Sequence, residues 1–295
     1  MKKQPSDQKQ KNMSKQTVHH LMKVKTKPSS VFWGMQWIAI FVIILFVSFF
    51  YCSPDSEPSS TDVIFQTTTI AALLDGQYDG NLSMKELKKH GNFGLGTFQA
   101  LNGEMIFFSD SVYQVRYDGK VCHVHDSVKT PFAVVTDYKP DLEFPIQESK
   151  NLEQLQSALN QKLTPTDMIY AIKIHGLFEY VKTRSVPEQK KPYRRLADVI
   201  ENQSVFEFQK IKGTVIGFRF PEYLKGINVP GYHFHFLDDT RTCGGHLLDC
   251  IIKEGNVEID VADKLFLMLP EHAENQKAES SEFDQDELDR IEKGK

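Results

Sequence analysis

The sequence predicts a mixed α/β fold that is rich in antiparallel sheet, built as two tightly joined subdomains and preceded by a single transmembrane helix. Three observations support this prediction. Short runs of β-branched and aromatic residues are separated by turn dipeptides such as Asn102-Gly103 and Asp118-Gly119. A few separate stretches, such as 149–163, show the residue spacing of helices instead. One long uncharged apolar segment, 31–52, lies near the N-terminus.

The first sixty residues divide into three parts. Residues 1–30 form a basic tail with eight lysines and one acid. Residues 31–52 contain no charged side chain and, at about 1.5 Å per residue, are long enough to span a hydrocarbon core of roughly 30 Å. Residues 53–60, SPDSEPSS, are typical of a linker. These parts predict a membrane segment or signal anchor ahead of one folded region, 61–295.

The lysines lie before the apolar segment, so the positive-inside rule predicts a cytoplasmic N-terminus. The expected location is therefore membrane-anchored through residues 31–52, with the folded region outside the cytoplasm, in the periplasm or the extracellular space. Cleavage as a signal peptide, which would give a secreted protein, is the alternative, and the sequence leaves it open. Lipid attachment at Cys52 is a third hypothesis, but the bulky residues before it argue against this.

The first half of the folded region predicts helices and an antiparallel meander. Residues 83–91 start with Ser83 and Glu86 in the spacing of a capping box and end at Gly91, which indicates a short helix. The runs that follow predict strands, and leucines at helical spacing predict a second helix. The expected strands are 93–101, 104–117 and 120–125, and the expected second helix is 149–163.

The second half predicts mostly strands. The expected strands are 168–184, 204–211, 213–220, 231–237 and 246–255, with a helix near 195–202. The tail, 271–295, has nine acids and four basic residues. We expect it to contain a helix with a thin apolar edge formed by Phe283, Leu288 and Ile291.

Composition excludes some classes of function. The formal net charge is −4 and the isoelectric point is near 6.2, which argues against nucleic acid as a partner because phosphate binding favours a basic surface. Four cysteines are too few for a disulfide scaffold in a chain of this size. The sequence leaves open whether Cys122, Cys243 and Cys250 are bridged or free.

Three histidines lie within GYHFHFLDDTRTCGGH, residues 231–246. On a strand, His233 and His235 point to the same face. The glycines after the turn allow a returning strand to bring His246 beside them. Three imidazoles with open coordination positions are typical of a catalytic zinc site. Asp238 and Asp239 are candidates to support these ligands, and ordinary strand histidines are the simpler interpretation.

Three segments together resemble the acetolactate decarboxylase family. They are GLGTFQALNGEM (94–105), YAIKIHGLFEYVKTRSVP (170–187) and GYHFHFLDDTRTCGGHLLD (231–249). The resemblance extends over roughly residues 62–295 and implies that the two subdomains form one catalytic unit. It implies the conversion of 2-acetolactate to acetoin and carbon dioxide at a zinc ion (Zn2+), and a homodimer with sheets joined across the subunits.

The resemblance also implies roles for particular residues. His233, His235 and His246 match the metal ligands of the family. The matching catalytic residues are Glu104, Arg184, Thr97 and a glutamate of the C-terminal tail. That tail aligns loosely, so Glu292 is favoured and Glu287 is the alternative.

The chemistry of the substrate is consistent with these implied residues. Loss of carbon dioxide from a β-keto acid leaves an electron pair that a metal can stabilise as an enediolate. An arginine such as Arg184 pairs well with the carboxylate or the enediolate. A carboxylic acid near the metal can then protonate one face of the enediolate. Whether Glu104 or the tail glutamate is this acid stays open, as does the stereochemical preference.

Two other classes of function remain as alternatives. A cupin-like metal dioxygenase uses a His-x-His pair followed by a carboxylate, and Asp239 lies four residues after His235. That hypothesis leaves Glu104 and Arg184 without a role. A non-enzymatic, membrane-tethered metal-binding protein would use the acidic tail for contacts with a partner.

Overall fold

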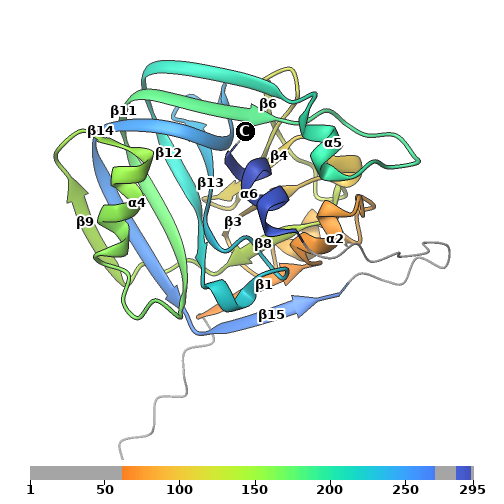
Figure 1. Ribbon diagram of the computed structural model, residues 1–295, viewed down its shortest axis with the longest axis horizontal. Coiled ribbons are helices and arrows are strands. Elements are labelled where there is room, and N and C mark those ends of the chain that lie inside the picture. Colours follow the sequence, from red (N-terminus) through yellow and green to blue (C-terminus); the bar gives the residue numbers. More distant parts are fainter. Residues whose placement is uncertain (1–61, 270–283, 294–295) are drawn as a thin grey trace, which may run out of the picture. The chain divides into compact units, whose positions relative to one another are not determined.

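Two sheets contain most strands of this computed structural model, which describes residues 62–269 and 284–293 (Figure 1). All of these residues belong to one compact unit of the chain, residues 58–295. Helices are few and short beside the sheets. The mixed α/β fold rich in antiparallel sheet is thus confirmed.

The first sheet has seven strands. In spatial order they are β15 (Lys264–Met268), β1 (Val63–Thr67), β8 (Ala133–Thr136), β3 (Phe93–Thr97), β4 (Glu104–Phe108), β5 (Ser111–Val115) and β6 (Val121–His123). Neighbours are antiparallel except β1 and β15, which pair in parallel. The run from β3 to β6 is the predicted meander, because short turns connect successive antiparallel strands.

The second sheet has six strands and curves strongly. They are β9 (Leu142–Ile146), β10 (Lys150–Asn151), β14 (Gly244–Ala262), β11 (Ile169–Ser185), β12 (Ser204–Phe220) and β13 (Gly231–Asp238). Strand β13 pairs with β12 along one edge and with the start of β14 along the other. Since β14 also pairs with β11, four strands form a closed ring of pairings.

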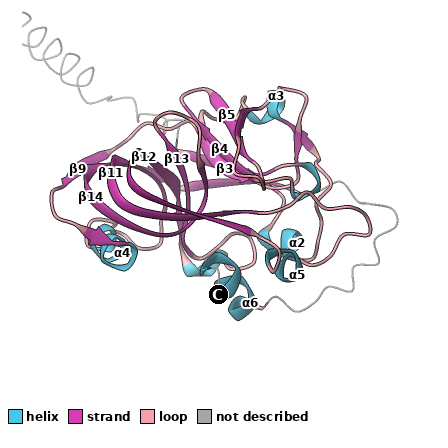
Figure 2. Cartoon of the chain, turned by 90° about the horizontal axis from the view of Figure 1, so that it is seen from above, coloured by secondary structure: helices cyan, strands magenta, loops and turns pink. Residues whose placement is uncertain are grey.

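The helices lie at two places. Helix α4 (Leu152–Asn160) packs on the curved sheet, whereas α2 (Ile70–Leu74), α5 (Leu196–Ile200) and α6 (Gln285–Lys293) gather together (Figure 2). The remaining small elements are α3 (Met84–Leu87), the 3-10 turns η1 (Gln99–Leu101) and η2 (Glu222–Leu224), and the strand pair β2 (Leu82–Ser83) and β7 (Lys129–Thr130). The capping box of Ser83 and Glu86 is present at α3.

One apolar cluster is shared by both sheets. It combines Ile106 of β4 and Phe218 of β12 with residues of α2, α5 and α6. Further clusters lie within the curved sheet beside α4 and on the other face of the seven-stranded sheet. The sheets therefore share a core, which fixes residues of one sheet against residues of the other.

Some predicted boundaries were wrong. The expected strand 104–117 is a hairpin, because Ser109 and Asp110 adopt left-handed φ angles of 53° and 60° and turn the chain. Strands 204–211 and 213–220 are one strand, β12. Strand β15 was not predicted, and Phe283 of the expected tail helix lies outside the described residues. The three described cysteines are free.

The predicted location, anchored through residues 31–52 with the catalytic domain outside the cytoplasm, is corrected. Among the residues that the structure describes, no helix is long and apolar enough to cross a bilayer. The longest have nine residues, about 14 Å in length, against a hydrocarbon core of roughly 30 Å. Residues 31–52, the segment of the predicted transmembrane helix, lie outside the described residues.

Candidate active site

The three histidines come together at the junction of β13 and β14. His233 and His235 alternate on β13 with Phe234 and Phe236, which are buried in the core of the curved sheet, and His246 of β14 lies directly opposite His235 in the ladder. The ring centroids are 5.0 to 5.3 Å apart, and one nitrogen of each ring lies within 4.8 Å of the other two. All three residues are buried. This is the expected trio, and it is able to hold a metal ion.

The hydrogen bonding of the ring nitrogens is compatible with metal binding. Nδ1 of His235 lies 2.8 Å from the carbonyl oxygen of Met105. Because a carbonyl only accepts, Nδ1 carries the hydrogen and Nε2 presents a lone pair. Nε2 of His235 and Nδ1 of His233 are both buried without a hydrogen-bond partner. Buried nitrogens in that state are rare in proteins unless a ligand completes them.

Burial also keeps the rings neutral. It lowers the pKa of His233 to about 3, and the nearby Arg184 acts in the same direction. Burial lowers the pKa of His235 and His246 well below the usual value as well. Neutral imidazole is the form that binds a metal ion, so the trio is ready for one at neutral pH.

The hairpin between the histidine strands is built on Asp238. Its buried carboxylate accepts hydrogen bonds from the backbone N–H groups of Thr240, Thr242 and Cys243, at 2.7 to 3.0 Å. Asp239 instead lies on the surface, with a carboxylate oxygen 3.2 Å from His175. Neither aspartate forms a hydrogen bond or ion pair with the three histidines. Asp238 acts through the turn, and the group of potential ligands does not include Asp239.

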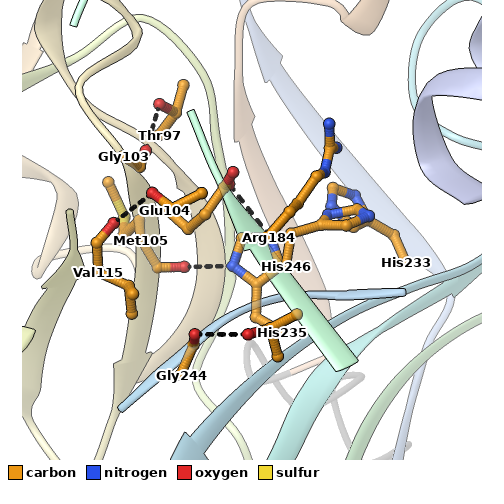
Figure 3. A network of polar contacts seen from close by, with 12 residues as sticks. Thr97, Gly103, Glu104, Met105, Val115, Arg184, His233, His235, Gly244 and His246 are labelled. Carbon is orange, nitrogen blue, oxygen red and sulfur yellow. Dashed lines mark hydrogen bonds and ion pairs between the residues drawn. The ribbon is translucent and has the colours of Figure 1, made fainter. Parts of the chain in front are cut away.

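Glu104 approaches from the seven-stranded sheet (Figure 3). Its carboxylate oxygen lies 3.8 Å from Nε2 of His235. The turn before it needs Gly103, whose φ is 79° and where a Cβ would lie 2.3 Å from the Val115 carbonyl oxygen. The hydroxyl of Thr97 donates to the Gly103 carbonyl at 2.8 Å. Thr97 therefore holds the turn that places Glu104, and it also lines the cavity.

Arg184 enters the cavity from β11, where it pairs with His246 in the ladder. Its neighbours point to the opposite face and anchor the strand. Thr183 donates to the Gly244 carbonyl, and Ser185 donates to the Val115 carbonyl, both at 2.8 Å. The guanidinium is buried, its Nε has no partner, and one terminal nitrogen lies 3.5 Å from Gln203.

Helix α6 brings Glu292 to the histidines. A carboxylate oxygen of Glu292 lies 3.8 Å from Nε2 of His233 and 3.7 Å from Nε2 of His246. Its backbone carbonyl lies 3.2 Å from the same His246 nitrogen. Glu287, the alternative, instead forms an ion pair with Arg195. The structure thus places Glu292, and not Glu287, in the cavity.

The two carboxyl groups have raised pKa values. Burial raises the pKa of Glu104 to about 7, against the attraction of Arg184 and with repulsion from Glu292. Burial likewise raises the pKa of Glu292 to about 7, against Arg184 and with repulsion from Asp289. Carboxyl groups of this kind hold a proton near neutral pH, which general acids require.

The apolar wall of the cavity could not be predicted from any sequence pattern. Six apolar side chains from α2, α5, the η1 turn and two loop segments complete it: Ile70, Leu73, Leu101, Phe132, Val186 and Leu196. Each belongs to an ordinary apolar pattern, so only the packing of α2, α5 and the sheets distinguishes them from other core residues. Such a wall excludes water and strengthens electrostatic interactions within the cavity.

The fold and the site together define an enzyme with a buried three-histidine centre between two sheets. Comparison with known proteins identifies its family. The family model of alpha-acetolactate decarboxylase matches residues 64–282, so the chain belongs to this family and is a carboxy-lyase.

Individual relatives agree with this assignment. The chain is similar to the alpha-acetolactate decarboxylase of Methanosarcina mazei, at 44% identity over 81% of this chain and 83% of the relative. It is 43% identical to that of Methylococcus capsulatus, over 70% and 80% of the two chains. The crystal structure of the Bacillus subtilis strain 168 enzyme superimposes with a TM-score of 0.76 at 36% identity, covering 79% of this chain and all of that one.

The family assignment decides between the classes of function that the sequence left open. The non-enzymatic tether does not agree with membership in a family of carboxy-lyases. The cupin-like dioxygenase required Asp239 near the histidines, but that side chain pairs with His175 on the surface. The expectation of an enzyme of the acetolactate decarboxylase family is confirmed.

Proposed function

We propose that the chain decarboxylates 2-acetolactate to acetoin and carbon dioxide, and that the reaction depends on a zinc ion held by His233, His235 and His246. Similarity to relatives that are named for this activity supports the substrate. The observation that carries the proposal is the buried histidine trio, with orphaned ring nitrogens, beside two carboxyl groups and one arginine. Three imidazoles with open positions suit catalytic zinc better than a closed structural site.

Zinc, when bound, would supply a Lewis acid that stabilises the negative charge of the enediolate. Arg184 binds the substrate carboxylate before the carbon–carbon bond breaks. Its guanidinium is buried with unused donors, and a planar carboxylate satisfies two of them at once. The bond then breaks, carbon dioxide leaves, and the electron pair moves toward the ketone oxygen.

The resulting enediolate takes a proton on the carbon that carried the carboxylate. Glu292 and Glu104 are the two groups placed to deliver that proton, because each lies near the trio with a pKa of about 7. We assign the donor role to Glu292, whose carboxylate oxygen lies beside two of the histidines, and assign Glu104, which lies beside one, to orienting the hydroxyl of the substrate. Thr97 supports Glu104 through the turn at Gly103.

Purified full-length protein, freed of metal by a chelator, tests the proposal. Racemic acetolactate should yield acetoin and carbon dioxide only after zinc is returned, without consumption of oxygen. Zinc should also raise the melting temperature, since a ligand that binds the folded state stabilises it. A variant with His233, His235 and His246 all replaced by Ala should show neither effect. Acetoin formation by that variant, or by fully metal-free enzyme, would contradict zinc dependence.

We further propose that the chain forms a homodimer. Strand β15 ends the seven-stranded sheet among the described residues, and Phe266 and Leu269 beside this edge are 57% and 66% exposed. An unpaired edge with exposed apolar side chains is a common site of association. Light scattering should give twice the mass of the chain, and Phe266→Asp should shift it toward the monomer.

A further inference from the structure

We propose that Arg195 and Glu287 are positioning residues for the decarboxylation. Their ion pair seats α6 on the body of the protein and thereby sets the position of the Glu292 carboxyl beside the histidines. Neither residue is among those that line the cavity. The inference rests on the proposed function, because it takes Glu292 as a group that acts on the substrate.

Helix α6 depends on contacts with the rest of the protein. It has nine residues, and isolated helices shorter than about 12–15 residues are marginal in water. Two of its aliphatic side chains, Leu288 and Ile291, are fully buried in the cluster shared by both sheets. These contacts fix which face of α6 is turned inward, but aliphatic packing is non-directional. A directional contact is needed to fix the helix along its own axis.

The ion pair of Arg195 and Glu287 is such a directional contact. A terminal nitrogen of Arg195 lies 2.7 Å from a carboxylate oxygen of Glu287, and only 13% of the Glu287 side chain is exposed. Glu287 precedes Glu292 by five residues, which is roughly 7.5 Å along a helix axis. Because the pair holds one end of this short segment, it limits sliding of the other end past His233 and His246.

Arg195 is well placed to act on more than one helix. It immediately precedes α5, and its guanidinium also lies 3.7 Å from Asp75 at the end of α2. Helices α2 and α5 supply Ile70, Leu73 and Leu196 to the cavity wall. Figures 1 and 2 both show α2, α5 and α6 side by side. One guanidinium therefore links the three helices that close the cavity.

Loss of the ion pair should lower turnover more than it lowers the stability of the fold. Partly exposed ion pairs contribute little to folding, and 41% of the Arg195 side chain is exposed. A misplacement of about 1 Å at a reacting group, however, can cost as much as 100-fold in rate. Loss of the pair should thus lower kcat while zinc content, KM and the melting temperature stay close to those of the wild type.

Glu287→Gln tests the inference on the α6 side and Arg195→Gln on the α5 side. Each should lower kcat about tenfold, within the range that positioning effects reach. Arg195→Lys, which keeps the charge, should retain part of the lost rate. Amide hydrogen exchange across 284–293 should accelerate in both Gln variants and stay unchanged in β13.

The matched controls are Asp286→Asn, an exposed neighbour on α6, and Arg194→Ala, whose hydrogen bond goes to the Asp198 carbonyl. Both controls should match the wild type.

A double variant separates positioning from a merely structural effect. If the pair acts through Glu292, adding Glu287→Gln to Glu292→Gln should cause no further loss of kcat. A full additional tenfold loss, or unchanged kcat and exchange in Glu287→Gln alone, would overturn the inference. Full activity of Glu292→Gln alone would instead overturn the proposed role of Glu292, and exchange across α6 then decides by itself whether the pair seats the helix.

Discussion

Arg184 shows how a single side chain can be prepared for a ligand at the expense of its own hydrogen bonding. Its Nε is buried without a partner, and its recorded contact with Gln203 is long, at 3.5 Å. Folded proteins seldom leave buried donors unpaired, because each one costs free energy. The flanking Thr183 and Ser185 compensate by anchoring the strand on its other face. The unused donors are what a carboxylate substrate would satisfy.

Arg184→Lys tests this role at the scale of one residue. Lysine keeps the charge but loses the planar pair of donors, so we expect kcat/KM to fall about 100-fold, or roughly 2.7 kcal/mol of transition-state stabilisation. Zinc content should not change, since no histidine is altered. Arg219→Lys is the matched control, because Arg219 lies on the same sheet and donates to the Thr166 carbonyl outside the cavity. If Arg184→Lys kept the wild-type kcat/KM, a bidentate contact between Arg184 and the substrate carboxylate would be excluded.

At the scale of elements, the hairpin from β13 to β14 decides the spacing of the three histidines. His235 and His246 oppose each other only because the turn between them has a fixed length and register. Asp238 fixes that turn by accepting three backbone N–H groups, and this hydrogen bonding helps to lower its pKa despite burial, the largest opposing cause. The aspartate therefore prepares the site without a recorded contact with the histidines.

Asp238→Ala should loosen this hairpin. Three partly buried N–H groups would lose their charged acceptor, so we expect a loss of about 2–3 kcal/mol in the free energy of unfolding. Zinc affinity should weaken at least tenfold, because the imidazoles would no longer be held in register. Chelator competition measures the affinity, and denaturant titration measures the stability. Asp239→Ala, which removes a surface contact with His175, should change neither; equal effects in the two variants would contradict the argument.

The elements also show what could be learned from the sequence. The capping box of Ser83 and Glu86 and the alternation of β13 are local signals, and both appear in the structure as expected. The hairpin at Ser109 and Asp110 was missed because it lacks the glycine that usually marks a left-handed turn. Local patterns thus predicted elements well, and failed where ordinary residues take an unusual conformation.

The site was harder to predict from the sequence than the helices and strands were. The histidine trio could be inferred from spacing, because a single hairpin brings its members together. The chain carried no local signal that Glu104, Arg184 and Glu292 would meet, since they come from two sheets and a distant helix. Only the family resemblance suggested them. The ion pair of Arg195 and Glu287 left no trace in the sequence pattern, because it depends on how α5 packs against α6.

At the scale of the whole molecule, the site exists because two sheets and the C-terminal helix close on one another. Hydrogen bonds from Ser185 to Val115 and from His235 to Met105 cross between the sheets. Helix α6 adds the last carboxyl group beside them. The histidines belong to the curved sheet alone, so metal binding and turnover should be separable.

Deletion of residues 284–295 tests this separation. We expect turnover to fall at least about 100-fold, because Glu292, the proposed general acid, is lost, while zinc content stays near that of the full chain. The melting temperature should be measured in parallel, since Leu288 and Ile291 leave the core. Parallel loss of zinc and turnover would show instead that α6 is needed to build the metal site itself.

The stability of the whole fold should depend on pH through Asp260, which lies on β14 away from the cavity. The residue is 4% exposed, and its carboxylate accepts one hydrogen bond from the Lys139 N–H. Burial raises the pKa of Asp260 to about 7, and the nearby Asp141, Asp62 and Asp137 add to the rise. The folded state therefore binds this proton more tightly than the unfolded state does.

The direction of the pH dependence follows from this difference in proton binding between the folded and unfolded states. Below about pH 4 the group is protonated in both states, and its contribution to stability is fully present. As pH rises toward 7, the unfolded chain ionises first, and the contribution is lost, to a limit on the order of 4 kcal/mol. Asp260→Asn cannot ionise, so denaturant titrations should show a smaller fall in its unfolding free energy from pH 4 to pH 8. The half-exposed Asp263→Asn is the control and should follow the wild type. Parallel curves for the wild type and Asp260→Asn would mean that the buried carboxyl is ionised in the folded protein at neutral pH.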